Sequence, residues 1–227
     1  MIKLEHISKS FNKNKILDDL SLTIESKQII GIFGANGIGK STLAKIICGL
    51  EKINDGKIYF NDALLYSNKQ KYNRKMGLKI QMVYQQPFAI LDPTQKIRSS
   101  FYELIRYYHL ADKKGEKEYV NSLGKKLSLD NDILNHLPSQ LSGGEAQRIA
   151  IGKCLLFKPE LIILDEATSM LDVSTQANIL SFLKEETKKL NASILIISHD
   201  ENLLKNYCDI IYELNDKTLK EKRLFNL

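Results

Sequence analysis

The sequence predicts an α/β fold in a single domain over residues 1–227, with a small antiparallel sheet near the N-terminus and a helical segment inserted in the core. Three observations predict these parts. Three continuous apolar runs end in polar residues, short stretches near the N-terminus alternate between apolar and polar residues, and one long stretch has helical periodicity. A chain of this length can bury a substantial core.

The apolar runs predict strands that are buried on both faces of a sheet. They are QIIGIFG, ELIILDEA and ASILIISHD, at residues 28–34, 160–167 and 192–200. Polar residues follow each run at its C-terminal end, and ligands gather at that edge of an open α/β sheet. We therefore expect a ligand site where these three runs end.

The N-terminal stretch IKLEHIS alternates as a strand does. Alternation places His6 on the same face as Ile2 and Leu4, and Ile7 on the opposite face. The stretches LTI and KIYF alternate in the same way, and the turn residues NDG precede the second of them. Together these stretches predict a small antiparallel sheet.

Residues from about 88 to 156 have the pattern of helices. RSSFYELIRYYHL and EYVNSLGKKL place apolar residues three and four apart. All four prolines of the chain lie within this part or beside it, at Pro87, Pro93, Pro138 and Pro159. We interpret the range 88–156 as a helical subdomain inserted in the α/β core.

The composition, 43% apolar and 26% charged, is typical of a globular domain, and no run approaches eighteen apolar residues. The net charge is +6, but the positive residues are scattered and often lie beside acids, which favours a solvated lysine-rich surface over a nucleic-acid partner. The N-terminus lacks the apolar core of a secretory signal, and the three cysteines lie far apart. We expect a chain that stays in the cytoplasm and binds no nucleic acid.

The stretch GANGIGKST matches the pattern G-x-x-x-x-G-K-[ST] in full. It follows an apolar strand run and precedes an apolar helical stretch, which is the context that this motif requires. Its backbone N–H groups are expected to hold phosphates, with Lys40 at the β- and γ-phosphates and Ser41 on Mg²⁺. The expected loop consists of Gly34, Ala35, Asn36, Gly37, Ile38, Gly39, Lys40, Ser41 and Thr42.

Two acids and a histidine end the other two apolar runs. We expect Asp165 to hold Mg²⁺ through water, and Glu166 to act as general base on the attacking water, a role worth about 10² to 10⁴ in rate. His199 ends the third run, where an imidazole can reach a γ-phosphate. A solvated acidic turn and a surface histidine are the alternatives, and the phosphate loop in the same chain weakens both.

In this order the motifs resemble those of ATP-binding-cassette ATPases over nearly the whole chain. LSGGE, at 141–145, is similar to the signature that defines that family, Gln85 to its Q-loop glutamine and SMLD, at 169–172, to its D-loop. His199 matches the switch histidine, and Phe11 falls where the family stacks an aromatic ring on adenine. The resemblance implies a phosphate-loop NTPase (RecA-like) core with an N-terminal antiparallel β subdomain and an inserted helical signature subdomain.

In that family two domains meet head to tail, and ATP is held between the phosphate loop of one and the signature helix of the other. The resemblance therefore implies that this chain contacts the nucleotide of its partner through Ser142, Gly143, Gly144 and Glu145. It also implies that ATP and Mg²⁺ are the cofactors. The implied metal ligands are Ser41, Gln85 and Asp165, and the implied catalytic residues are Glu166, His199, Gln85 and Lys40.

The resemblance extends to partners and to a branch of the family. It implies a second ATPase subunit, identical or different, transmembrane permease subunits and, indirectly, a solute-binding protein, with the chain peripheral on the cytoplasmic face of the membrane. The segment QQPFAILDPTQKI and the stretch TSMLDVSTQANIL are similar to importers of peptides, nickel and metal chelates. Only 28 of 227 residues follow His199, which slightly favours the shorter subunits of metal or metal-chelate import over those of peptide import.

Three other functions remain as alternatives: an exporter ATPase, a soluble ATPase of the family that acts on DNA or ribosomes, and a cassette that does not hydrolyse ATP. The LDPTQKI segment argues against the first. The second usually has two fused cassettes, long coiled-coil inserts or zinc sites, none of which appears in this sequence. The third is expected to lack Lys40 or Glu166, and both are present. Two positions depart from the pattern of the family. Glu145 replaces the usual signature glutamine, and Ala167 replaces a proline that often follows the catalytic glutamate.

Overall fold

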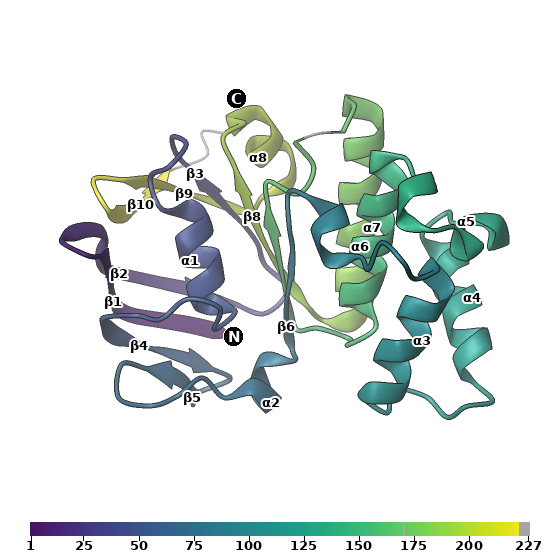
Figure 1. Cartoon of the computed structure of the whole chain (residues 1–227). Coiled ribbons are helices and arrows are strands. Elements are labelled where there is room, and N and C mark those ends of the chain that lie inside the picture. Colours follow the sequence, from purple (N-terminus) through teal and green to yellow (C-terminus); the bar gives the residue numbers. More distant parts are fainter. Residues whose placement is uncertain (170, 223–227) are drawn as a thin grey trace. The chain divides into compact units, whose positions relative to one another are not determined.

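The computed structural model describes residues 1–169 and 171–222, which form two compact units (Figure 1). The first unit contains Met1–Met82, Pro159–Glu166 and the described residues from Phe182 onward. The second contains Val83–Lys158 and Ala167–Ser181. The range 88–156, expected as a helical insertion, falls inside the second unit.

The first unit contains two sheets. A four-stranded antiparallel sheet has the order β2-β1-β4-β5, and a six-stranded sheet has the order β10-β9-β3-β8-β7-β6. The strands of the first sheet are β1 (Ile2–Phe11), β2 (Asn14–Ile24), β4 (Asp55–Phe60) and β5 (Ala63–Ser67). Those of the second are β3 (Ile29–Phe33), β6 (Ile80–Val83), β7 (Leu161–Asp165), β8 (Ser193–Ser198), β9 (Ile210–Asn215) and β10 (Thr218–Lys222).

The helices complete the two units. They are α1 (Lys40–Ile47), α2 (Arg74–Gly77), α3 (Ile97–Tyr107), α4 (Glu116–Lys126), α5 (Asn131–Asn135), α6 (Gly143–Leu155), α7 (Val173–Leu190) and α8 (Glu201–Tyr207), with 3₁₀ turns η1 (Pro87–Ile90) and η2 (Pro138–Gln140). Among residues 1–169 and 171–222, no helix combines the length and apolar character that a bilayer span requires.

The three apolar runs form neighbouring parallel strands, as predicted. β8 lies between β3 and β7, and every residue of β7 and β8 is buried. Phe33 pairs with Ser198, and Asp165 pairs with Ile197, so all three strands end at one edge of the sheet. Helix α1 begins seven residues beyond the end of β3, and β7 and β8 are each followed at the same edge by the polar residues of the expected site.

The antiparallel sheet is also confirmed, but the predicted alternation of β1 is wrong at His6. Leu4 pairs with Leu22 and Ile7 with Leu20, so β1 has one residue more than β2 between these pairs. This β-bulge places Ile7 in the core and leaves His6 exposed with φ of 54°. The carbonyls of Glu5 and His6 then lie so close to Gly56 that a Cβ there would be 2.6 Å from each oxygen.

The second unit is a helical cluster held by an apolar centre and a polar bridge. The two predicted helical stretches are confirmed as α3 and α4. Phe101 of α3 is 1% exposed and packs on α6 at Gly152, where an added Cβ would be 3.2 Å from the ring. The Arg98 guanidinium donates to side-chain oxygens of Asn121 at 2.8 Å and Asn131 at 3.0 Å, and so ties α3 to α4 and α5.

Candidate active site

The phosphate-loop motif forms a tight turn between β3 and α1. Gly39, the residue before the helix, has φ of 118°, and an added Cβ would lie 2.8 Å from Ile16 of β2. At Gly34 an added Cβ would lie 2.8 Å from the carbonyl oxygen of Leu214. Larger residues are therefore excluded from both positions, because the loop backbone lies directly against neighbouring strands.

The start of α1 is suited to bind an anion. Its N-cap, Gly39, has no side chain to accept a hydrogen bond, and no acidic residue lies in the first turn. The first N–H groups of a helix have no partner within the helix and carry the positive end of its dipole. A phosphate at this position would accept hydrogen bonds from those groups and be attracted by the dipole.

The ammonium group of Lys40 lies inside the loop. The residue is only 4% exposed, and Nζ donates to the carbonyl oxygens of Gly34 at 2.8 Å and Ala35 at 2.9 Å. The carboxylate of Glu166 lies 3.7 Å from Nζ. A buried ammonium is costly unless it is hydrogen-bonded or paired, and these three oxygens stabilise it where phosphates are expected.

Asp165, at the end of β7, reaches the first turn of α1. Its Oδ1 accepts a hydrogen bond from the Ser41 hydroxyl at 2.9 Å. Burial raises the pKa of Asp165 above its usual value, while the Ser41 hydroxyl opposes this shift by stabilising the charged form. Burial thus disfavours the charged carboxylate, and a cation bound beside it would offset that cost.

Two of the three residues that the resemblance assigns to Mg²⁺, Ser41 and Asp165, fit that ion. Mg²⁺ takes oxygen ligands and usually keeps several of its waters. Ser41 Oγ offers a direct ligand, and Asp165 Oδ1, 2.9 Å from it, is close enough to hold the ion through one of those waters. Mg²⁺ usually has only one or two protein ligands and completes its coordination with phosphate oxygens and water. One hydroxyl, with one carboxylate acting through water, agrees with that number.

Glu166 follows Asp165 in a left-handed backbone conformation, with φ of 48°. Its N–H donates to the carbonyl of Ile197 at 3.0 Å, which fixes the turn against β8. A left-handed residue with a side chain costs roughly 1–2 kcal/mol, and such strain often occurs at functional sites. The turn directs the carboxylate toward Lys40 and toward His199, whose Nδ1 is 3.6 Å from Oε1.

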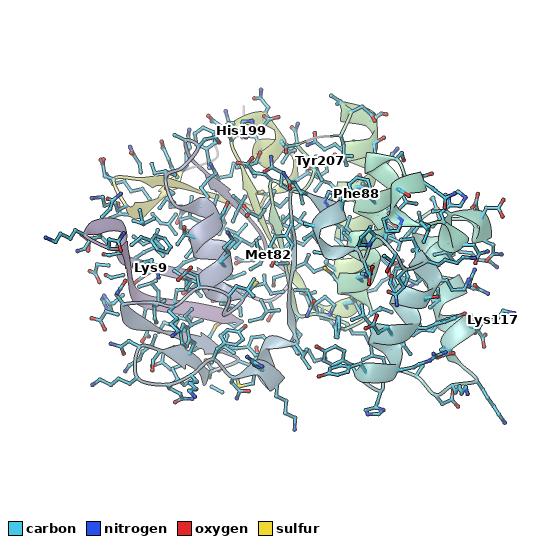
Figure 2. The ribbon with its side chains drawn as sticks, viewed as in Figure 1. Lys9, Met82, Phe88, Lys117, His199 and Tyr207 are labelled. Carbon is cyan, nitrogen blue, oxygen red and sulfur yellow. The ribbon has the colours of Figure 1, made fainter. Side chains whose placement is uncertain are left out.

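His199 immediately follows β8, and its side chain is 53% exposed, so its ring is open to solvent on one side of the site (Figure 2). The next residue, Asp200, caps α8 by accepting hydrogen bonds from Asn202 N and Leu203 N. The cap holds the backbone just beyond the histidine in place. The first unit thus brings together five predicted side chains from three separate motifs: Lys40, Ser41, Asp165, Glu166 and His199.

Phe11 also belongs to the first unit, at the end of β1. The residue is 43% exposed, and the Lys9 ammonium lies over its ring, with Nζ 4.4 Å from the ring centroid. Lys9 was not singled out from the sequence. The one signal in the sequence was its place two residues before Phe11 in a strand, which suggests that the two side chains are neighbours. The pairing of Lys9 with Glu51 could not be predicted, because the two residues are 42 positions apart.

The signature residues lie in the second unit, where they open α6 as predicted. Ser142 is the N-cap, and its Oγ accepts a hydrogen bond from Glu145 N at 3.3 Å. The Glu145 carboxylate in turn accepts one from Ser142 N at 2.7 Å, which completes a capping box. This N–H lowers the pKa of Glu145 below its usual value. Around Gly143 there is open space among the described residues, since an added Cβ would meet none of their atoms within 4 Å.

Gln85 lies in the second unit as well, just after β6. Its Nε2 is 3.5 Å from Ser169 Oγ, a long contact at the exposed surface. Ser169 begins the expected D-loop, whose Met170 lies outside the described residues. A pocket of about 430 Å³ opens beside Gln85, and its lining consists of Gln85, Gln86, Pro87, Phe88, Ala89, Gly143, Gln147, Ala167 and Leu171.

Residues 17–169 match a family model described as ABC transporter, which covers more than half of the chain. The chain belongs to the ABC transporter family. The resemblance of the motifs is thereby confirmed.

Two relatives show how far the similarity extends. The oligopeptide transport ATP-binding protein OppF of Lactococcus lactis subsp. lactis (strain IL1403) is 33% identical over 206 residues, which are 91% of this chain and 65% of OppF. The nickel import ATP-binding protein NikE of Escherichia coli (strain K12) is 30% identical over 209 residues, 92% of this chain and 78% of NikE. The chain thus spans somewhat less than two thirds of the length of OppF.

A solved structure of the ABC family confirms the fold class. The ATP-binding cassette MJ0796, in a dimeric post-hydrolysis state bound to ADP and Pi, matches with a TM-score of 0.85 and 27% identity, and the match covers 100% of both chains. The predicted α/β phosphate-loop fold class is therefore confirmed for the described residues.

Proposed function

We propose that this chain is the subunit of an ABC importer that binds and hydrolyses ATP. The observation that carries the proposal is the convergence of Lys40, Ser41, Asp165, Glu166 and His199 at the carboxyl edge of one sheet. The names of the relatives support it, because OppF and NikE are described as ATP-binding proteins of transport and import. They favour import over the exporter alternative.

The first unit provides the groups that bind the nucleotide. The N–H groups of the loop and of the first turn of α1 would hold the phosphates, with Lys40 at the β- and γ-phosphates. Ser41 and Asp165 would hold Mg²⁺, which would neutralise negative charge on the phosphates when it is bound. Gln85 is a proposed further ligand, taken from the Q-loop of the family. Phe11 would stack on adenine with its exposed ring.

Hydrolysis requires an in-line water and a place for its proton. In the proposed step the water oxygen bonds to the γ-phosphorus, the bond from that phosphorus to the bridging oxygen breaks, and ADP leaves with the electron pair. Glu166 accepts the proton of the water, and His199 hydrogen-bonds a γ-phosphate oxygen. Lys40 lies within 3.7 Å of Glu166 and stabilises the charge that develops on the phosphate oxygens.

The signature residues would act on the nucleotide of a second cassette. Ser142, Gly143 and Gly144 would offer a hydroxyl and backbone N–H groups at the start of α6 to its γ-phosphate. The open space around Gly143 suits such an approach. Glu145 is turned back onto Ser142, so its charge is partly engaged within α6. The partner would be a second ATPase subunit, identical or different.

The pocket beside Gln85 is the proposed contact with a permease. Pro87 and Phe88 give it an apolar wall, and the ring of Phe88 is 44% exposed (Figure 2). Gln147 is 2% exposed, and its Nε2 has no hydrogen-bond partner in the described part of the chain. A short helix of a membrane subunit, inserted here with a free backbone carbonyl at its end, would bury the ring and pair the amide.

The transported substrate is proposed from the relatives and from the sequence. OppF is named for oligopeptides and NikE for nickel, so the substrate would be nickel, a metal chelate or a peptide. A solute-binding protein would deliver it, and the chain would lie on the cytoplasmic face of the membrane, bound to its permease.

The test compares two carboxylate variants of this chain. Each carries an affinity tag, and the complex that contains it is purified from membranes of the cells in which the chain naturally occurs. Glu166→Gln is expected to lower ATP hydrolysis about 10²-fold or more while MgATP still binds. Glu160→Gln, at the other end of β7, is the matched control and is expected to hydrolyse ATP at the wild-type rate. Wild-type turnover by Glu166→Gln would refute the role of Glu166.

Cells that lack the chain identify the substrate class. We expect them to lose uptake of labelled nickel, of a nickel chelate or of a labelled peptide, and complementation by wild type but not by Glu166→Gln ties the loss to hydrolysis. Retained uptake of all three, with accumulation of another solute inside the cell, would contradict import.

A further inference from the structure

Lys9 of β1 is a buried lysine with two partners. The residue is 7% exposed, and its side chain is labelled in Figure 2. Its Nζ donates to Glu51 Oε1 at 2.6 Å and lies 4.4 Å from the centroid of the Phe11 ring. A desolvated ammonium at that distance from a ring is attracted by its π-electrons more strongly than an exposed one.

Glu51 is itself held firmly, so it fixes the ammonium in place. Its carboxylate also accepts a hydrogen bond from Lys52 N at 3.0 Å, and Lys9 lowers its pKa below the usual value. The backbone N–H of Glu51 donates to the carbonyl of Lys45 in the last turn of α1. Lys9 therefore connects Phe11 to the helix that begins at the phosphate loop.

The ring of Phe11 lies in a hairpin that contacts the same loop. Phe11 pairs with Asn14, and Ile16, two residues further along β2, packs against Gly39. Lys9 lies over one face of the ring, and 43% of the residue remains exposed. Phe11 is therefore accessible to solvent in a hairpin that packs against the phosphate loop at Gly39.

We propose that Lys9 is a positioning residue for the nucleobase. Its ammonium holds the Phe11 ring from one face, anchored by Glu51, so that the opposite face is preset to stack on a base. The cation also draws π-electron density toward itself, so the opposite face becomes less negative and favours an electron-rich purine. This inference rests on the proposed role of Phe11 in binding adenine.

The test separates the base from the phosphates by calorimetric titration of the purified chain with two probes, MgATP and magnesium tripolyphosphate. Lys9→Met is expected to weaken MgATP binding about three- to tenfold and to leave tripolyphosphate binding within about twofold. Lys9→Arg keeps a cation at the ring and is expected to restore most of the affinity. Lys3→Met is the matched control. It also removes one positive charge from β1 and breaks one ion pair, that of Lys3 with Glu5.

Phe11→Ala distinguishes the inference from the function on which it rests. If Phe11→Ala weakens MgATP binding while Lys9→Met does not, the role of Lys9 is wrong and that of Phe11 stands. If Lys9→Met weakens both probes equally, the role of Lys9 is wrong whatever Phe11→Ala shows. If Phe11→Ala binds MgATP as wild type does, the stacking role itself fails. If circular dichroism shows that Lys9→Met is unfolded, Glu51→Gln is used instead, because it removes the charge that anchors the Lys9 ammonium. The proposal again requires a loss of affinity for MgATP and none for tripolyphosphate.

Discussion

Two helices of this chain begin at glycines where phosphate is expected, and they begin in different ways. α1 follows Gly39, which provides no side-chain cap, has no acid in its first turn and places Lys40 at its first position. α6 follows Ser142, and its first turn is closed by a capping box with Glu145. The start of α1 therefore has charge and free N–H groups for a tightly bound anion, whereas that of α6 is already stabilised within its own unit.

The difference indicates a division of labour between the two helix starts. A lysine inside a loop and an uncapped helix favour strong binding of phosphate by one chain alone. A self-capped helix with a nearby carboxylate is stable without a ligand and attracts an anion weakly, so it suits a contact that forms and dissolves in each cycle. The following substitutions test this comparison.

The largest effect is expected at Lys40. Lys40→Met removes the ammonium that lies among the carbonyls of Gly34 and Ala35 and near Glu166. Loss of such a charge at a transferring phosphate lowers turnover roughly 10²- to 10³-fold. The measurement is the steady-state ATPase rate of the tagged complex, and a rate within tenfold of wild type would show that Lys40 is not used in the chemistry.

Ser142→Arg tests the other helix start. A long cation at this N-cap blocks the approach of a second cassette, so turnover by the complex is expected to fall about as far as in Lys40→Met. The conservative control Ser142→Thr keeps the cap and is expected to retain most of the ATPase rate. Normal turnover by Ser142→Arg would mean that α6 makes no contact with the reacting phosphate.

A matched pair of glycine substitutions compares the backbones of the two starts. Gly39→Ala places a Cβ at φ of 118° and 2.8 Å from Ile16, and is expected to lower the free energy of unfolding by about 1–3 kcal/mol. In Gly143→Ala the new Cβ meets none of the described atoms, and the backbone is helical. This substitution is expected to change the free energy of unfolding by less than about 1 kcal/mol, and any change should be an increase. Urea denaturation measures both, and equal losses would contradict the comparison.

The smallest effect concerns Glu145. Glu145→Gln keeps an oxygen for Ser142 N but removes the charge, so the free energy of unfolding at pH 7 is expected to change by less than about 1 kcal/mol. Because the pKa of Glu145 is lowered in the folded chain, the stability it adds is present above its unfolded pKa, about 4.3, and is lost as pH falls through the folded value. Unfolding of the variant should lack this part of the pH dependence.

The same substitution has a second expected readout. Without the carboxylate, the start of α6 repels a γ-phosphate less, so the ATPase activity of the complex should depend less steeply on salt. An unchanged salt dependence would show that Ser142 N already neutralises the influence of this charge.

Much of the first unit could be predicted from the sequence, because each of its signals is local. A continuous motif defines the loop from Gly34 to Thr42, and parallel strands necessarily bring Asp165, Glu166 and His199 to one edge. The face of His6 could not be predicted, since a single bulged residue reverses the alternation of β1. Strands β6, β9 and β10 carry no run long enough to separate them from loops.

The details that refine the site depend on distant partners and on backbone angles. The ion pair of Lys9 with Glu51 joins residues 42 positions apart, and no spacing rule connects them. The left-handed conformation of Glu166 is not encoded by a glycine or asparagine, and it is fixed by the carbonyl of Ile197 on another strand. The capping box of Ser142 and Glu145, by contrast, is visible in the sequence as a serine three residues before a glutamate.

The most direct measurement is the affinity of the isolated chain for MgATP in three forms: wild type, Lys40→Met and Ser142→Arg. We predict that Lys40→Met binds MgATP at least about tenfold more weakly than wild type, because the ammonium of Lys40 is proposed to contact the phosphates of the nucleotide bound by the same chain. Ser142→Arg is predicted to bind within about twofold of wild type, because we propose that α6 acts on the nucleotide of another chain. A loss of affinity in Ser142→Arg as large as that in Lys40→Met would contradict the account.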